Sequence, residues 1–212
     1  MSVSAFVGAS CGAVVGILPV DDWIYVAEKI QPIYGEPMPI VPDVKNWTWV
    51  LERQCPDCGF DATATDYAAV PTLVRDSASR FAVTLARADA RVRPDDSTWS
   101  VLEYGAHVRD VCRIFDTRLG LTLAGAGDGI PRFANWDQDA TAEADRYGEQ
   151  DPAVVATELA EAAEAIARAF ESVPKSQRGL RGERSDGAVF TVDSLSRYFV
   201  HDLVHHIHDV RG

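Results

Sequence analysis

The sequence has few cysteines and few basic residues. Its 212 residues include four cysteines, which are too few and too scattered for the disulfide framework of a small secreted domain. Lysine and arginine number 20 against 32 aspartates and glutamates, which gives a net charge of -12. A surface that binds nucleic acid needs the opposite balance, because it gains affinity by neutralising phosphates. We therefore expect a cytoplasmic protein without a nucleic-acid partner.

The first twenty residues lack the lysine or arginine that precedes the apolar run of an export signal. Gly8, Gly12 and Gly16 have a spacing that suits helix packing in membranes, but a run so rich in glycine and alanine is a marginal span. The stretch IQPIYGEPMPIVPDVKNW then carries four prolines, so it cannot form a continuous helix. We expect no membrane segment and an irregular N-terminal extension over residues 1–60.

After residue 60 the sequence lacks sustained strand alternation, and its apolar residues recur with helical spacing. Four helices are predicted: one that begins near Thr65 or Asp66 and ends before Pro94, one from the Asp95–Ser97 region to Gly125, one with Asp151 as its N-cap, and one that follows Thr191. This pattern predicts an all-α four-helix bundle over residues 61–212, in which sites are built from inward-facing side chains of different helices.

Four of the five histidines lie in HDLVHHIHDV, residues 201–210. His201 and His205 share one face of the fourth predicted helix, opposite the face that carries Leu203. Two imidazoles one turn apart can bind a single ion, and a catalytic zinc site has three protein ligands with an open fourth position. His107 is the only distant histidine that can complete the set. We therefore predict that His107, His201 and His205 bind a divalent metal, with zinc favoured and nickel or iron also open.

Neighbouring residues leave several alternatives open. Asp110, Asp202 and Asp209 can orient the histidine rings, and His208 is a substitute third ligand. A histidine-rich helix end without a metal is also possible chemically, since imidazolium favours a helix C-terminus, but it leaves His107 unexplained. HDLVH matches the metalloprotease pattern H-E-x-x-H with aspartate in place of glutamate, and the shorter carboxylate disfavours a protease.

CPDCGF contains Cys55 and Cys58, the only closely spaced cysteines. A zinc ribbon needs a second ligand pair at suitable spacing, and none follows. A redox pair needs a helix N-terminus in a βαβ setting, which is also missing. We interpret the two cysteines as reduced structural thiols, and Cys112 as a small core residue.

An acidic connection of about twenty residues separates the second and third predicted helices, a length typical of functional loops. Trp136 can cover a ligand there while Asn135 and Arg146 provide polar contacts, and Tyr198 on the histidine-bearing helix is a further candidate. The alternative is a surface connection anchored by aromatic residues. Other arginines that can bind an anionic substrate are Arg109, Arg113 and Arg197.

The segments WSVLEYGAHVRDV and YFVHDLVHHIHDV resemble the DinB/YfiT-like superfamily, including its mycothiol-dependent maleylpyruvate isomerase and thiol-transferase branches. The resemblance covers about residues 60–210. It implies a four-helix bundle with a divalent metal on one ligand from the second helix and two from the fourth. The isomerase branch has glutamate at the position matched to His201 and an additional C-terminal domain, so we expect a general DinB or thiol-transferase type instead.

The resemblance implies a metal that lowers the pKa of a bound low-molecular-weight thiol, of the mycothiol type, or of water. We expect attack by that group on an electrophilic small molecule, and a homodimer. Two alternatives stay open: a metal-dependent hydrolase, and a non-catalytic DinB-like stress or binding protein with a structural metal.

Overall fold

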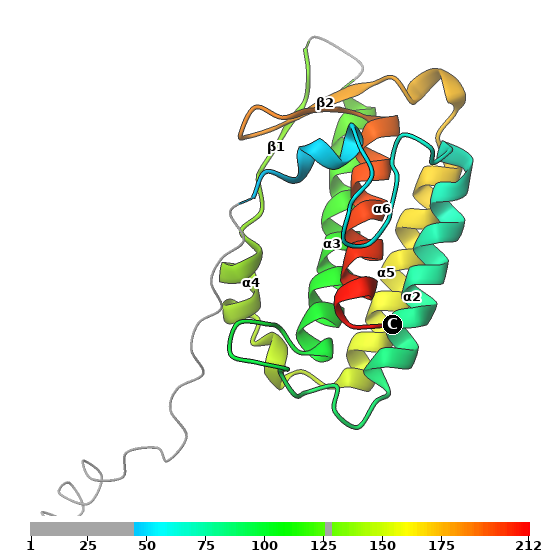
Figure 1. The fold of residues 1–212 in the computed structure, drawn as a ribbon. Helices are drawn as coiled ribbons and strands as arrows, with labels where there is room; N and C mark the ends of the chain where they lie inside the picture. The colour runs from blue at the N-terminus through cyan, green and yellow to red at the C-terminus, as the bar shows by residue number, and fades with distance from the viewer. Residues whose placement is uncertain (1–44, 126–128) are drawn as a thin grey trace, which may run out of the picture. The chain divides into compact units, whose positions relative to one another are not determined.

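Four long helices form the body of the protein (Figure 1). The structure, a computed structural model, describes residues 45–125 and 129–212. The helices are α2 (Val70–Leu85), α3 (Val101–Ala124), α5 (Pro152–Ser172) and α6 (Val192–Asp209). Helix α5 packs against α2 and α3, and α6 packs against the same two helices. The predicted four-helix bundle is confirmed.

Side-chain caps set where the helices begin. Ser100 and Glu103 form a capping box at α3, a few residues later than the predicted Asp95–Ser97 region. Asp151 caps α5 as predicted, and its carboxylate accepts from two backbone N–H groups of the first turn. Thr191 caps α6 together with Ser194. Each such cap stabilises its helix by about 1 kcal/mol.

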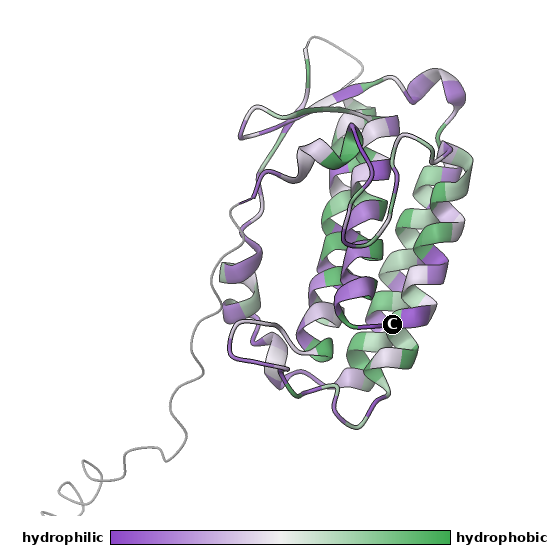
Figure 2. Cartoon of the chain, in the orientation of Figure 1, coloured by the Kyte–Doolittle hydropathy of each residue, from purple (hydrophilic) through white to green (hydrophobic). Residues whose placement is uncertain are grey.

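The core lies between the apolar stripes of the four helices. Phe199 of α6 is fully buried, and its ring centroid lies 5.0 Å from that of Phe115 on α3 and 5.9 Å from that of Phe170 on α5. The predicted apolar stripe of α6 is buried throughout, at Leu195, Phe199, Leu203 and Ile207. In Figure 2 hydrophobic and hydrophilic residues alternate along the long helices, as expected for helices buried on one face.

A small sheet and several short helices lie in the connections. Strand β1 (Arg132–Phe133) pairs in parallel with β2 (Arg181–Arg184), which pairs antiparallel with β3 (Val189–Thr191). These strands were not predicted, because two to four residues are too few to show alternation. The short helices are η1 (Trp47–Leu51), η2 (Tyr67–Ala69), α4 (Gln138–Ala144), η3 (Tyr147–Glu149) and η4 (Lys175–Gln177).

Residues 45–66 cross α6 in Figure 1, where they are drawn in blue to cyan. Helix η1 packs against α6, and Val50, Cys55 and Phe60 are buried. The part of the predicted N-terminal extension that the structure describes thus packs on the bundle. The predictions for residues 1–44 lie outside the described residues. Within residues 45–125 and 129–212, no helix has both the length and the apolarity of a membrane span.

Candidate metal and substrate site

Helix α6 carries two pairs of potential metal ligands on different faces. His201 and His205 are one turn apart, and so are Asp202 and His206. The two pairs are offset by one residue, which turns them apart by about 100° around the helix axis. They therefore face different neighbours, and each pair belongs to a separate group of potential ligands.

The first group consists of His107 from α3 with Asp202 and His206 from α6. The Asp202 Oδ1 atom lies 3.1 Å from Nε2 of His206 and 3.6 Å from Nε2 of His107. One ligand atom from each residue lies within 4.8 Å of the other two. Two imidazoles and one carboxylate from two facing helices make a donor set that zinc and ferrous iron both accept.

The His107 ring is buried. It is 1% exposed, and neither ring nitrogen makes a hydrogen bond with a described residue. Burial lowers the pKa of His107, which keeps the imidazole neutral, the form that binds metals. Unpartnered buried polar atoms are rare and call for an explanation, and a bound cation supplies one.

Carboxylates make the surroundings of His206 favourable for a cation. Burial alone would raise the pKa of Asp202, but the His107 and His206 rings, whose Nε2 atoms lie 3.6 and 3.1 Å from its Oδ1 atom, outweigh burial and hold that pKa well below its usual range. Burial alone would likewise lower the pKa of His206, yet Asp202 and Asp209 raise it to about 9. The His206 Nδ1 atom lies 2.9 Å from Oδ2 of Asp209, so this carboxylate fixes the ring with Nε2 toward Asp202.

A cavity of about 530 Å³ adjoins this group, and Asp202 and Tyr198 of α6 line it. Trp136, from the connection between α3 and α5, also lines it and stacks on His107 with a centroid distance of 5.2 Å and an interplanar angle of 9°. The cavity thus has an aromatic wall over one potential ligand and another potential ligand in its own lining. A small molecule bound in this cavity would therefore lie next to a metal ion bound by the group.

Two buried arginines, Arg118 of α3 and Arg184 of β2, also line the cavity. Arg184 pairs with Asp186 and donates to the Tyr198 hydroxyl at 3.3 Å. Arg118 is 6% exposed and donates to the Ala134 carbonyl, and among the described residues no carboxylate forms an ion pair with it. Burial and the nearby Arg184 lower the pKa of Arg118 to about 10, so it stays charged at neutral pH. A buried cation without a counter-ion favours an anionic ligand.

The sequence model of the DinB superfamily matches residues 72–210. The chain belongs to this superfamily. The resemblance predicted from the two histidine-bearing segments is therefore confirmed. Among solved structures, this DinB-superfamily chain is similar to YfiT from Bacillus subtilis, with a TM-score of 0.59 and 17% identity over 68% of this chain and 84% of that one. That protein is described as a probable metal-dependent hydrolase with an unusual four-helix bundle topology, and the likeness shows a shared fold. A comparison with curated proteins gives no match.

The structure divides the three ligands that we predicted for this DinB-superfamily bundle. His107 joins Asp202 and His206, whereas His201 and His205 lie with Cys55 and Cys58 in the second group. That His107, His201 and His205 bind one ion together stays a prediction, and the geometry does not favour it. His208, the predicted substitute, belongs to neither group, and its side chain is 55% exposed.

The predicted supporting carboxylates differ in their contacts. Asp110 was expected to orient His107, but its carboxylate accepts hydrogen bonds from Arg109 and from the Tyr147 hydroxyl instead. Neither ring nitrogen of His107 makes a hydrogen bond with a described residue, so Asp110 does not orient this ring in the structure. Asp209 does contact a histidine of the site, His206, and Asp202 lies among the potential ligands themselves.

Three of the four predicted substrate-binding residues line the cavity beside the metal group: Asn135, Trp136 and Tyr198. Arg146 does not line it, is exposed, and pairs with Glu149. The other three candidate arginines also form ion pairs with carboxylates outside this cavity: Arg109, Arg113 and Arg197. Sequence reasoning missed His206, Arg118 and Arg184. A signal existed only for His206, because Asp202 and His206 have the same spacing as the chosen histidines.

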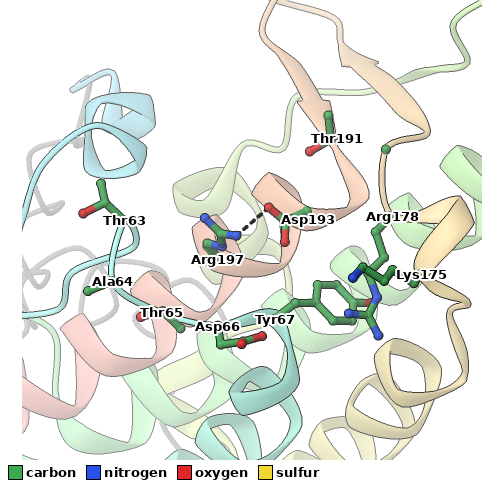
Figure 3. A pocket seen from close by; sticks show the side chains of 11 residues that line it. Thr63, Ala64, Thr65, Asp66, Tyr67, Lys175, Arg178, Thr191, Asp193 and Arg197 are labelled. Carbon is green, nitrogen blue, oxygen red and sulfur yellow. Dashed lines mark hydrogen bonds and ion pairs between the residues drawn. The ribbon is translucent and has the colours of Figure 1, made fainter.

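A second cavity, of about 590 Å³, is lined by residues of the chain before α2 and by the start of α6 (Figure 3). Arg197 pairs with Asp193 at 2.6 Å, and Arg178 lies over the Tyr67 ring at 4.0 Å. None of its lining residues belongs to either group of potential metal ligands. This cavity is therefore separate from both groups of potential ligands.

Proposed function

We propose that this DinB-superfamily protein is a metal-dependent enzyme that acts on an anionic small molecule. The observation that carries the proposal is the group of His107, Asp202 and His206 beside a cavity lined by Arg118, which forms no ion pair with a carboxylate of the described residues. Three protein ligands are typical of catalytic zinc sites, which keep one position open for water or substrate. The description of YfiT as a probable metal-dependent hydrolase supports the same class.

Arg118 and Trp136 would each have a role beside the proposed metal that follows from their contacts. When bound to this group, a divalent ion would lower the pKa of a water or thiol that it holds. Arg118 would bind the anionic group of the substrate, since it is charged, buried and without a carboxylate partner among the described residues. Trp136 would exclude water from the side of His107 on which it stacks.

Tyr198 would act as a proton donor. Its hydroxyl accepts a hydrogen bond from Arg184, which leaves its own proton directed elsewhere. Burial raises the pKa of Tyr198, so the phenol keeps that proton at neutral pH. Because Tyr198 lines the cavity, the proton is available to a leaving group or a developing oxyanion there.

Metal analysis of protein purified without a histidine tag tests the site. We expect His206→Ala and Asp202→Ala to lose about one equivalent of metal, since each removes one of three ligands. His208→Ala is the matched control, because His208 lies on the same helix outside both groups. Unchanged metal content in both variants would remove the centre of the proposed chemistry.

A second experiment separates thiol chemistry from hydrolysis. Mycothiol, bacillithiol and glutathione are titrated into cobalt-loaded protein, and hydrolysis of a panel of carboxylate-bearing esters and amides is followed in parallel. A spectral change with a thiol that His206→Ala abolishes supports thiol activation. Ester or amide turnover that depends on Arg118 and His206, without any thiol response, supports a hydrolase. If neither occurs while metal stays bound, the ion is structural and the enzyme proposal fails.

A further inference from the structure

The second group of potential ligands joins two distant parts of the chain. Cys55 and Cys58 come from the loop before α2, and His201 and His205 come from one face of α6. One ligand atom from each of the four residues lies within 4.8 Å of the other three. The Sγ atom of Cys55 lies 3.6 Å from Nδ1 of His205, and neither cysteine forms a disulfide.

The loop that carries the cysteines is held in a tight turn by its own backbone. The Cys55 N–H donates to the Phe60 carbonyl at 2.8 Å, and the Gly59 N–H donates to the Cys55 carbonyl at 3.0 Å. Gly59 has a φ of +75°, a conformation that favours glycine. The Gln54 side-chain amide donates to the Gly59 carbonyl at 2.7 Å. This turn presents the Cys55 and Cys58 side chains together toward α6.

Aromatic rings enclose the histidine side of the group. The Trp47 ring lies 5.6 Å from His201 and 5.0 Å from His205 between centroids, and Phe60 lies 6.1 Å from His201. His201 is 3% exposed, and its Nε2 atom has no hydrogen-bond partner among the described residues. A buried nitrogen without a partner is costly unless a ligand satisfies it.

We propose that Cys55, Cys58, His201 and His205 bind a structural zinc ion. With zinc–sulfur and zinc–nitrogen bonds of about 2.3 and 2.0 Å, tetrahedral ligand atoms stand about 3.3–3.8 Å apart. The 3.6 Å between Cys55 Sγ and His205 Nδ1 falls in that range. Two thiolates and two imidazoles fill all four positions, which is typical of structural zinc and leaves no place for a substrate. The missing second ligand pair of the CPDC motif is thus supplied from α6.

This ion would fasten residues 45–60 to the helix that also carries Asp202 and His206. Trp47 contacts both zinc-binding imidazoles and also lines the 530 Å³ cavity. The zinc site therefore fixes one wall of that cavity without taking part in its chemistry. It is independent of the proposed enzymatic function, because it involves none of the residues of the other group.

Cobalt substitution of the unmodified protein tests the zinc site directly. Cobalt bound by two thiolates shows intense sulfur-to-metal charge-transfer absorption in the near ultraviolet, which a histidine and carboxylate site cannot produce. We expect this absorption in the unmodified protein and in His206→Ala, and its loss in Cys58→Ala and His205→Ala. Its absence from the cobalt-loaded unmodified protein would overturn the proposal, whatever the variants do.

Metal content provides the second measurement. We expect Cys55→Ala and Cys58→Ala each to lose about one equivalent of zinc, because a tetrahedral structural site requires its four ligands. Cys112→Ala is the matched control, since Cys112 is a buried free cysteine on α3 outside both groups. Full zinc retention in folded Cys58→Ala, checked by circular dichroism, would refute the assignment. Zinc loss from the control as well would show general unfolding and count against it equally.

Discussion

Asp209→Asn tests whether this carboxylate supports the ion proposed at His107, Asp202 and His206. Asp209 accepts from Nδ1 of His206 at 2.9 Å and does not itself belong to the ligand group. Loss of a carboxylate that orients a metal-binding histidine weakens metal affinity by about 10- to 100-fold. This range corresponds to about 1.4–2.7 kcal/mol of binding free energy. Because asparagine can still accept one hydrogen bond, we expect an effect nearer the lower end.

Competition with a chromogenic chelator measures the affinity. The Cys58→Ala background is used, so that only the ion at the three-ligand group is titrated. Asp116→Asn is the control, because Asp116 is an exposed residue of α3 and its change alters the net charge equally. An unchanged affinity in Asp209→Asn, or an equal loss in Asp116→Asn, would refute the local role argued for this carboxylate.

Three further predictions concern stability. In Tyr147→Phe the Asp110 carboxylate loses a hydrogen bond of 2.7 Å. Urea denaturation should then show an unfolding free energy that is lower by about 1.5–3 kcal/mol. A loss below about 0.5 kcal/mol would contradict this. Burial alone would raise the pKa of Asp110, but Arg109 and Tyr147 hold it below its ordinary value of 3.8. The ionised carboxylate therefore stabilises the fold above pH 3.8, and this stabilisation is lost as the pH falls through the folded pKa. Asp110→Asn should flatten the acid side of a curve of unfolding free energy against pH. An unaltered slope would contradict this. Phe199→Ala should cost about 3–5 kcal/mol, whereas alanine at Leu121, which is 41% exposed, should cost far less; equal costs would refute the assigned core.

The helices could be predicted because their signals are local. Asp151 followed by Pro152 specifies a helix start by chemistry that needs no tertiary contact, and the apolar spacing of α5 continues from there. The buried stripe of α6 follows from the same spacing. The strands β2 and β3 carry no such local signal, because they are too short to show the alternation of apolar and polar residues that is typical of a strand.

The ligand sets could not be predicted, because they depend on how α6 is rotated. His201 with His205 and Asp202 with His206 have identical spacing, and only packing against α3 decides which pair meets His107. Preferring histidine to aspartate favoured the pair that lies with Cys55 and Cys58 and away from His107. His205, which lies beside Cys55, is 150 residues further along the chain, beyond the range of any local motif.

The double use of α6 limits how this protein can diversify. An insertion or deletion between Asp202 and His205 would turn both downstream histidines by about 100° and break both pairs at once. If both groups bind ions as proposed, the length and register of this helix are constrained by two sites together. Adaptation of the proposed enzyme to a new substrate would then fall to the segments around α6. The α3–α5 connection with Trp136 and the β2–β3 hairpin with Arg184 line the cavity, and their described residues belong to neither group of potential ligands.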